Sequence, residues 1–283
     1  MARAEADEPA PATAWPGDPL LCWPSDEAHY GRRLLSYAAG LRLMQRLCDR
    51  PPSAPDVLMV VEHPPTITLG RRGGAANIHG RLLHGADGEA RQVAVHEVAR
   101  GGDVTWHGPG QLVVYPIVQL TRLQGPIGRG PLGDLPALVR GLEEAIIEAC
   151  TMIGLVTCLR AGFSGVWIDE RTKLASIGVG VQRGWSLHGL ALNVEPRLEG
   201  FDLITPCGLQ GVQMSSIRRE FERTGRGPPP WSVVESALLT ALCRRLRRRS
   251  AEELAAPRED ETTAEMAGEV ALPDQVAPVS GAG

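Results

Sequence analysis

The sequence predicts an α+β fold: a mixed, largely antiparallel sheet with helices packed on one side. Predicted strands come in groups, and the predicted helices fall between the groups rather than after every strand, which is typical of α+β domains. The 283-residue chain is 43% hydrophobic, enough for a packed core, and no internal repeat is visible. We therefore expect a single domain built from one sheet and its helices.

An amphipathic helix is the first predicted element. Ser25 is a suitable N-cap, and apolar residues between Tyr30 and Leu47 recur at spacings of three and four. Seven later segments, rich in β-branched and aliphatic residues and bounded by turn residues, are predicted strands. They are residues 57–62, 66–70, 93–98, 111–120, 165–169, 173–181 and 187–194.

Two further helices are predicted. Asp134 begins the second, and Gly154 can end it. Ser232 and Glu235 match a capping box at the start of the third, which ends in a basic run at residues 244–249. The side chains expected in the core are Leu138, Leu142, Ala145, Ile146 and Ala149 in the second helix, and Val234, Leu238, Ala241, Leu242 and Leu246 in the third.

Charge divides the chain into a basic body and two acidic tails. Residues 250–283 carry a net charge of −7 and residues 1–16 a net charge of −2, and subtracting both from the total of −4 leaves +5 for residues 17–249. We expect both tails to be disordered and residues 17–249 to form the single globular domain. A basic body suits an acidic protein partner or nucleic acid, although an ordinary solvated surface would look the same.

Membrane and metal sites are not expected. No apolar run reaches the ~18 residues of a membrane span, and the first residues lack a secretory signal pattern, which predicts a cytoplasmic protein. The six cysteines show no CxxC spacing, which argues against a zinc site, and they should stay reduced in the cytoplasm. Cys48, Cys150 and Cys243 lie in helical apolar patterns and are predicted core residues, whereas Cys207 lies on a turn between Pro206 and Gly208.

Lysine occurs only once. Of the 29 Lys and Arg residues, 28 are arginine and one is Lys173. Arginine does not give up its proton in proteins, whereas the pKa of a lysine amine can be tuned by its surroundings. Lys173 is thus either a group that handles a proton or a chance survivor on the surface.

A glycine-rich turn, residues 100–110, separates two predicted strands. Its sequence, RGGDVTWHGPG, lets the backbone approach a ligand closely and supplies polar side chains beside it. It matches neither the GxxxxGK[ST] phosphate loop nor GxGxxG. A plain hairpin is the alternative, but such loops usually have two to five residues.

The stretch RGGDVTWHGPGQLVVYP resembles the signature of the lipoyl(octanoyl) transferases, and two segments in the same order, residues 173–194 and 205–209, agree with it. Residues 62–73 resemble the family's early strand, so that the similarity spans about residues 20–220. The resemblance implies a fold shared with the catalytic domain of biotin and lipoate protein ligases, a mixed sheet flanked by helices.

By this resemblance, Cys207 is a nucleophile that carries the acyl group as a thioester, and Lys173 lowers its pKa and transfers protons. His107 and His188 are possible further bases, although a lone histidine is more often structural. No cofactor and no metal are implied. The residues implied to line the acyl site are Arg100, Gly101, Gly102, Asp103, Val104, Thr105, Trp106, His107, Ser176, Ile177, Gly178, Gly189, Leu190 and Ala191.

The implied reaction moves an octanoyl group from acyl carrier protein to a lysine of the lipoyl domains of 2-oxoacid dehydrogenases and glycine cleavage proteins, without ATP. Both partners are typically acidic, and the candidate docking arginines are Arg218, Arg219, Arg223, Arg226 and those within residues 244–249. The rival predictions are an ATP-dependent lipoate or biotin ligase on the same fold and, from another class, a non-catalytic nucleic-acid-binding module. Neither nucleic acid nor membrane is expected as a partner.

Overall fold

The computed structural model describes residues 20–22, 27–29, 32–85, 88–120, 135–209 and 211–246. All of them belong to one compact unit, residues 1–248. The two predicted tails, residues 1–16 and 250–283, lie outside the described residues.

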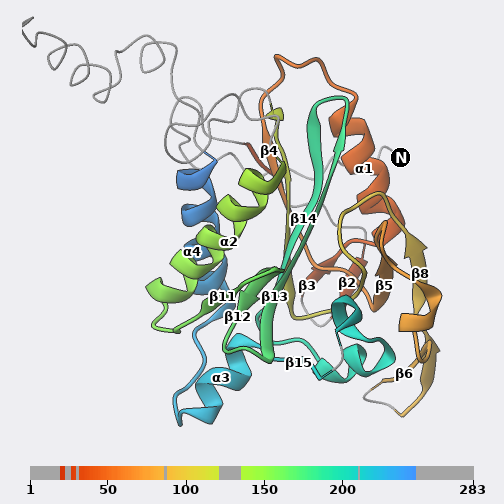
Figure 1. Ribbon diagram of the computed structural model, residues 1–283, viewed down its shortest axis with the longest axis vertical. Helices are drawn as coiled ribbons and strands as arrows, with labels where there is room; N and C mark the ends of the chain where they lie inside the picture. Colours follow the sequence, from red (N-terminus) through yellow and green to blue (C-terminus); the bar gives the residue numbers. More distant parts are fainter. Residues whose placement is uncertain are drawn as a thin grey trace, which may run out of the picture. The chain divides into compact units, whose positions relative to one another are not determined.

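A mixed eight-stranded sheet forms the centre of this unit (Figure 1). The strand order is β1 (Leu20–Cys22), β4 (Val57–Val61), β10 (Gln111–Ile117), β14 (Trp185–Asn193), β13 (Thr172–Gln182), β12 (Phe163–Trp167) and β11 (Cys158–Arg160), with β15 (Gln213–Met214) paired to β13. Among the described strands of this sheet, only the β1–β4 and β13–β15 pairs are parallel. The predicted mixed, largely antiparallel sheet is therefore confirmed.

Helices cover both faces of the sheet. α2 (Leu135–Met152) and α4 (Trp231–Arg245) pack together on one face, and α1 (Tyr37–Cys48) packs on the other (Figure 1). The expectation of helices on one side is wrong, because every residue of β4 and β10 is buried and neither face is left to solvent. The apolar residues predicted in the cores of α2 and α4 are buried as expected.

A second, three-stranded sheet stands beside the first. It consists of β8 (Ala94–Glu97), β5 (Thr66–Leu69) and β9 (Val104–His107), and it has a small core of its own that includes Trp106 and Phe201. The remaining elements are the hairpins β2 (Glu27–His29) with β3 (Arg32–Leu34) and β6 (Leu82–His84) with β7 (Ala90–Gln92), α3 (Ile217–Arg223), and the 3-10 turns η1 (Ala75–Asn77), η3 (Leu198–Leu203) and η4 (Pro206–Gly208).

The first helix begins later than predicted. It starts at Tyr37 after the N-cap Ser36, and not after Ser25. The segments that precede it pair as the β2–β3 hairpin, with Glu27 opposite Leu34, so that strand pairing overrides the helical spacing of the apolar residues.

Two other boundaries also differ from expectation. The helix α4 begins directly after Pro230, which places Ser232 inside the helix. No capping box forms, and Glu235 instead accepts a hydrogen bond from Trp231 Nε1 at 2.9 Å. The predicted glycine-rich turn contains the strand β9, which pairs along its whole length with β5.

Candidate active site

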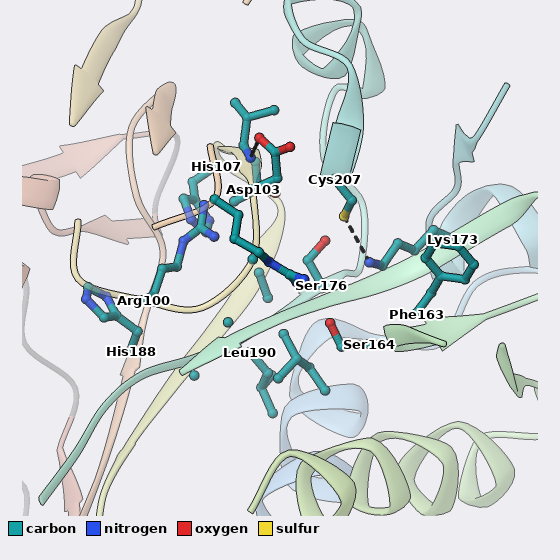
Figure 2. Close-up of a pocket in the computed structure, with 18 of the residues that line it drawn as sticks. Arg100, Asp103, His107, Phe163, Ser164, Lys173, Ser176, His188, Leu190 and Cys207 are labelled. Carbon is teal, nitrogen blue, oxygen red and sulfur yellow. Dashed lines mark hydrogen bonds between the residues drawn. The ribbon is translucent and has the colours of Figure 1, made fainter. Parts of the chain in front are cut away.

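A pocket of about 330 Å³ lies between the two sheets (Figure 2). One wall comes from β13 and β14 of the large sheet. The other comes from the 100–103 loop and from β9 of the small sheet. Cys207 and Lys173 also line this pocket.

Cys207 is half-buried and lies in the short turn η4 with a left-handed backbone, φ 58° and ψ 16°. This conformation costs a non-glycine residue on the order of 1–2 kcal/mol. The turn is fastened to a neighbouring loop, because Thr205 N–H donates to Asn77 O at 2.9 Å and its hydroxyl is hydrogen-bonded to His79 Nε2 at 2.6 Å. These contacts hold the thiol in place despite the backbone strain.

Lys173 lies near the start of β13 and is only 2% exposed. Its Nζ donates a hydrogen bond to Cys207 Sγ at 3.1 Å and lies 5.0 Å from the centre of the Trp167 ring (Figure 2). Gly165 packs against its stem: a Cβ there would come within 2.7 Å of Lys173 Cε. Among the described residues no carboxylate pairs with this amine, so Cys207 is its polar partner.

Arg100 brings a second cation to the pocket wall. It is 7% exposed and donates to the backbone oxygen and the hydroxyl of Thr68, both at 2.8 Å. Burial lowers the pKa of the Arg100 guanidinium, but arginine keeps its charge in proteins. In the described part of the chain its hydrogen-bond acceptors are all neutral, so it adds a positive charge beside the pocket that favours an anion.

Aromatic and imidazole rings gather at the end of the pocket away from Cys207. Tyr37, His107, Tyr115 and His188 line the cavity, and Figure 2 shows His188 at the opposite end from Cys207. Tyr115 is hydrogen-bonded to His63 Nε2 at 2.8 Å, and His107 Nδ1 to Gln111 Oε1 at 3.0 Å. Hydrogen bonds to the surrounding protein thus fix several of these rings.

Both histidines in the pocket are uncharged near neutral pH. Burial lowers the pKa of His107 well below its ordinary value and lowers the pKa of His188 to about 3. Burial also raises the pKa of Tyr37 to about 12. These rings are therefore polar but uncharged near neutral pH, with the cationic Arg100 beside them, and neither histidine contacts Cys207 or Lys173 in the described structure.

Most of the predicted acyl-site residues do line this pocket, with two exceptions. Gly101 instead joins the small sheet to the large one, because its N–H donates to Val179 O at 2.8 Å. Trp106 is 1% exposed and packs edge-on against Phe201 in the core of the small sheet. The side chain that was expected in the acyl site is therefore buried in that core rather than in the pocket wall.

Several lining residues were not predicted from the sequence. They are Tyr37, Arg72, Tyr115, Gly162, Phe163, Ser164 and Leu209. The rarity of Tyr and Phe could have pointed to some of these residues. The chain has only three of each, and two of the tyrosines and one of the phenylalanines line the pocket.

The arginines proposed for docking are mostly engaged within the protein. Arg218, Arg223, Arg244 and Arg245 form ion pairs with glutamates, and Arg226 donates to a backbone oxygen at 3.0 Å. Of the candidates within the described ranges, Arg219 alone has no such side-chain partner. The other arginines of residues 244–249 lie outside the description.

Two features are absent from the described residues. None of the helices in these ranges is long and apolar enough to cross a membrane. In the same part of the chain no group of three or more His, Cys, Asp or Glu residues could hold a metal ion.

Comparisons with known proteins identify relatives of this chain. Residues 36–242 match the family model of the lipoyl protein ligase A/B catalytic domain. An octanoyltransferase of Acidobacterium capsulatum is 43% identical over 199 residues, which cover 68% of this chain and 78% of that protein. One of Mycobacterium leprae is 39% identical over 214 residues, covering 74% and 84%.

Solved structures share the fold. Lipoate-protein ligase A bound with ATP superposes with a TM-score of 0.53 at 12% identity and covers 84% of this chain and 92% of that one. A bi-partite lipoate protein ligase from Thermoplasma acidophilum, studied with its E2 lipoyl domain, gives 0.53 at 14% identity, with 84% and 89% covered. These likenesses confirm the predicted fold class.

Proposed function

The chain belongs to the lipoyl protein ligase A/B catalytic domain family, and we propose that within this family it is an octanoyltransferase that carries the acyl group on Cys207. Its relatives at about 40% identity are octanoyltransferases. The observation that carries the proposed mechanism is the contact of 3.1 Å between Lys173 Nζ and Cys207 Sγ at one end of the pocket. An ammonium at this distance favours the thiolate, which is the nucleophilic form of cysteine.

In the first half-reaction the Cys207 thiolate attacks the carbonyl carbon of an octanoyl thioester on acyl carrier protein. The bond between that carbon and the carrier's sulfur breaks, and the leaving thiolate takes a proton from the Lys173 ammonium. The products are octanoyl-Cys207, a free carrier thiol and a neutral Lys173 amine. One thioester replaces another, so the step is close to balanced in free energy.

In the second half-reaction the amine of a lysine on a lipoyl domain attacks octanoyl-Cys207. The carbon–sulfur bond breaks, an amide forms, and the neutral Lys173 amine takes the proton that the attacking nitrogen loses. The enzyme returns to its thiolate and ammonium forms. An amide is more stable than a thioester, so the reaction needs no ATP.

The pocket wall beside the pair suits an acyl chain. Ser176, Gly178, Gly189 and Ala191 are small, and Leu190 is apolar. Gly178 lies directly opposite Gly189 in the β13–β14 ladder, so the two strands present no side chains at that point. Burial of an alkyl chain there contributes about 0.8 kcal/mol for each methylene removed from water.

The acceptor assignment is supported by a structural neighbour that was studied with its E2 lipoyl domain. The donor assignment to acyl carrier protein is supported by the thiolate, because a thiolate exchanges readily with a thioester. The proposal places the reaction in the cytoplasm, where thiols stay reduced and Cys207 remains available.

Intact-protein mass spectrometry tests the proposal. After mixing with octanoyl carrier protein, the enzyme should gain the mass of one octanoyl group, and Cys207→Ala should gain none. Cys158→Ala is a matched control, because Cys158 is exposed and does not line the pocket. Retention of the added mass by Cys207→Ala would exclude this thiol as the carrier.

Adding a lipoyl domain should then discharge the enzyme and yield an octanoyl amide without ATP. The ATP-dependent ligase predicts no transfer until ATP is supplied. The binding module predicts no acylation at all. Transfer that depends on ATP would contradict the proposal.

A further inference from the structure

His188 has an unusual backbone for its position. It lies within β14, opposite Val179 of β13, and yet its φ is 59°. A non-glycine residue in the left-handed region is uncommon, and inside a paired strand it signals strain that the surroundings must support. Such strain is a reason to ask what the side chain does.

The ring lies at the end of the pocket opposite the Lys173–Cys207 pair (Figure 2). Ser176, opposite Ala191, and Val179, opposite His188, are three ladder positions apart, which corresponds to roughly 10 Å of strand. An extended chain advances about 1.2 Å per bond, so the seven carbon–carbon bonds of an octanoyl group span roughly 8 Å. The length of the small-residue wall therefore matches that of an eight-carbon chain.

Neighbouring groups hold the His188 ring across the pocket end. Its Nδ1 lies 3.4 Å from Tyr37 OH, and its ring meets that of Tyr115 edge to face, with centroids 6.3 Å apart. The residue is 1% exposed, and no described residue offers its Nε2 a hydrogen-bond partner. A longer acyl chain would collide with the ring or cover this nitrogen with methylene groups, and burying an unpaired polar atom is unfavourable.

We infer that the His188 side chain is the end stop of the acyl site and limits the transferred chain to about eight carbons. The inference rests on the proposed function and adds the residue that sets its acyl specificity. His188 acts through shape and desolvation and takes no part in bond making.

Glycine is the informative substitution, because it removes the ring and also accepts the left-handed backbone. His188→Gly should load decanoyl and dodecanoyl groups from carrier protein. A buried methylene gives about a fourfold gain, so two more should raise the decanoyl-to-octanoyl ratio of kcat/KM roughly tenfold or more. His188→Asn, which also tolerates this backbone, should give a smaller shift in the same direction.

Arg183→Gly is the matched control. Arg183 lies in the turn between the same two strands, has φ 51°, is exposed, and does not line the pocket. It undergoes the same backbone change and should keep the wild-type chain-length profile. If His188→Gly loads octanoyl groups with an unchanged profile, or loses them without gaining longer ones, the inference is wrong; should that variant not fold, His188→Asn decides in the same way.

Binding of free fatty acids separates this inference from the proposed function. In a Cys207→Ala background no transfer is required, and the His188→Gly change should raise the affinity for decanoate relative to octanoate by a similar factor. If the wild type transfers no octanoyl group but this shift occurs, the proposed function fails and the end stop stands. If transfer occurs and the shift does not, the end stop fails alone.

Discussion

Replacing Lys173 by methionine removes the ammonium group beside Cys207 and keeps most of the length of the side chain. The variant should react more slowly with iodoacetamide at pH 7, because alkylation requires the thiolate. The rate of alkylation therefore measures how much the Lys173 charge contributes to the thiolate population.

The structure sets the size of the effect. An ordinary cysteine, with a pKa near 8.5, is only about 3% thiolate at pH 7, so raising the thiolate to half of the population would require about 2 kcal/mol. Two unit charges 3.1 Å apart attract each other by about 5 kcal/mol at an effective dielectric constant of 20. Screening by solvent at the half-buried thiol could halve this attraction, and the remaining energy would still exceed the roughly 2 kcal/mol needed to ionise half of the thiol at pH 7. We therefore expect Lys173→Met to slow alkylation at pH 7 by at least about 15-fold, the ratio of half to 3% thiolate.

The assay follows the alkylation rate between pH 5 and 10 by mass spectrometry. Wild type should be alkylated faster than Lys173→Met at pH 7, and the two rates should converge towards pH 10, where any thiol is ionised. Lys173→Arg is the control that keeps the charge but cannot release a proton. It should be alkylated rapidly and yet discharge its thioester slowly to a lipoyl domain. Equal alkylation profiles for wild type and Lys173→Met would refute the electrostatic reasoning.

Three further predictions concern the surroundings of the site. Gly165→Ala should slow acyl loading at least tenfold and destabilise the fold by about 1–3 kcal/mol in urea titrations. The reason is that the φ of Gly165 is +106° and that a Cβ would lie 2.4 Å from a backbone oxygen and 2.7 Å from Lys173 Cε. Loading at the wild-type rate would contradict this. As the pH falls from about 6.5 towards 3, both histidines take up protons in the unfolded chain, whereas His188 and His107 stay neutral in the folded protein because they are buried. The free energy of unfolding should therefore drop by up to about 1.4 kcal/mol per pH unit for each histidine. His188→Asn should reduce the slope of this pH dependence, measured by urea unfolding. Trp106→Ala should cost about 3–5 kcal/mol of stability while chain-length preference stays unchanged, because this ring fills the core of the small sheet; a changed preference would place the ring in the pocket after all.

Both the sheet and the Lys173–Cys207 pair could be predicted from the sequence, but for different reasons. Strands such as Val57–Val61 and Gln111–Ile117 are continuous apolar runs, and burial on both faces requires that composition. The pair was accessible only through ordered motifs, because the two residues are 34 positions apart and long-range pairing through β15 brings them together.

The errors have physical causes as well. The spacing of apolar residues before Tyr37 imitates a helix, but those residues pair as strands, and the sequence carries no sign of that pairing. No role for Tyr37, the first residue of the observed helix, followed from the sequence, and this residue lines the pocket. The motif that contains Trp106 was treated as one turn, whereas pairing with β5 makes it a strand whose side chains serve two different environments.

The buried amine of Lys173 has one more consequence for a protein that carries a reactive thioester. An activated acyl group can modify any accessible ε-amino group, including those of the enzyme that holds it. This chain has a single lysine, and that lysine is 2% exposed inside the site. Its surface therefore offers no side-chain amine to a neighbouring copy, however concentrated the enzyme becomes. Arginine supplies the positive charge of the body without competing for the acyl group, so no surface lysine of a neighbouring copy competes with the lysine of the acceptor domain.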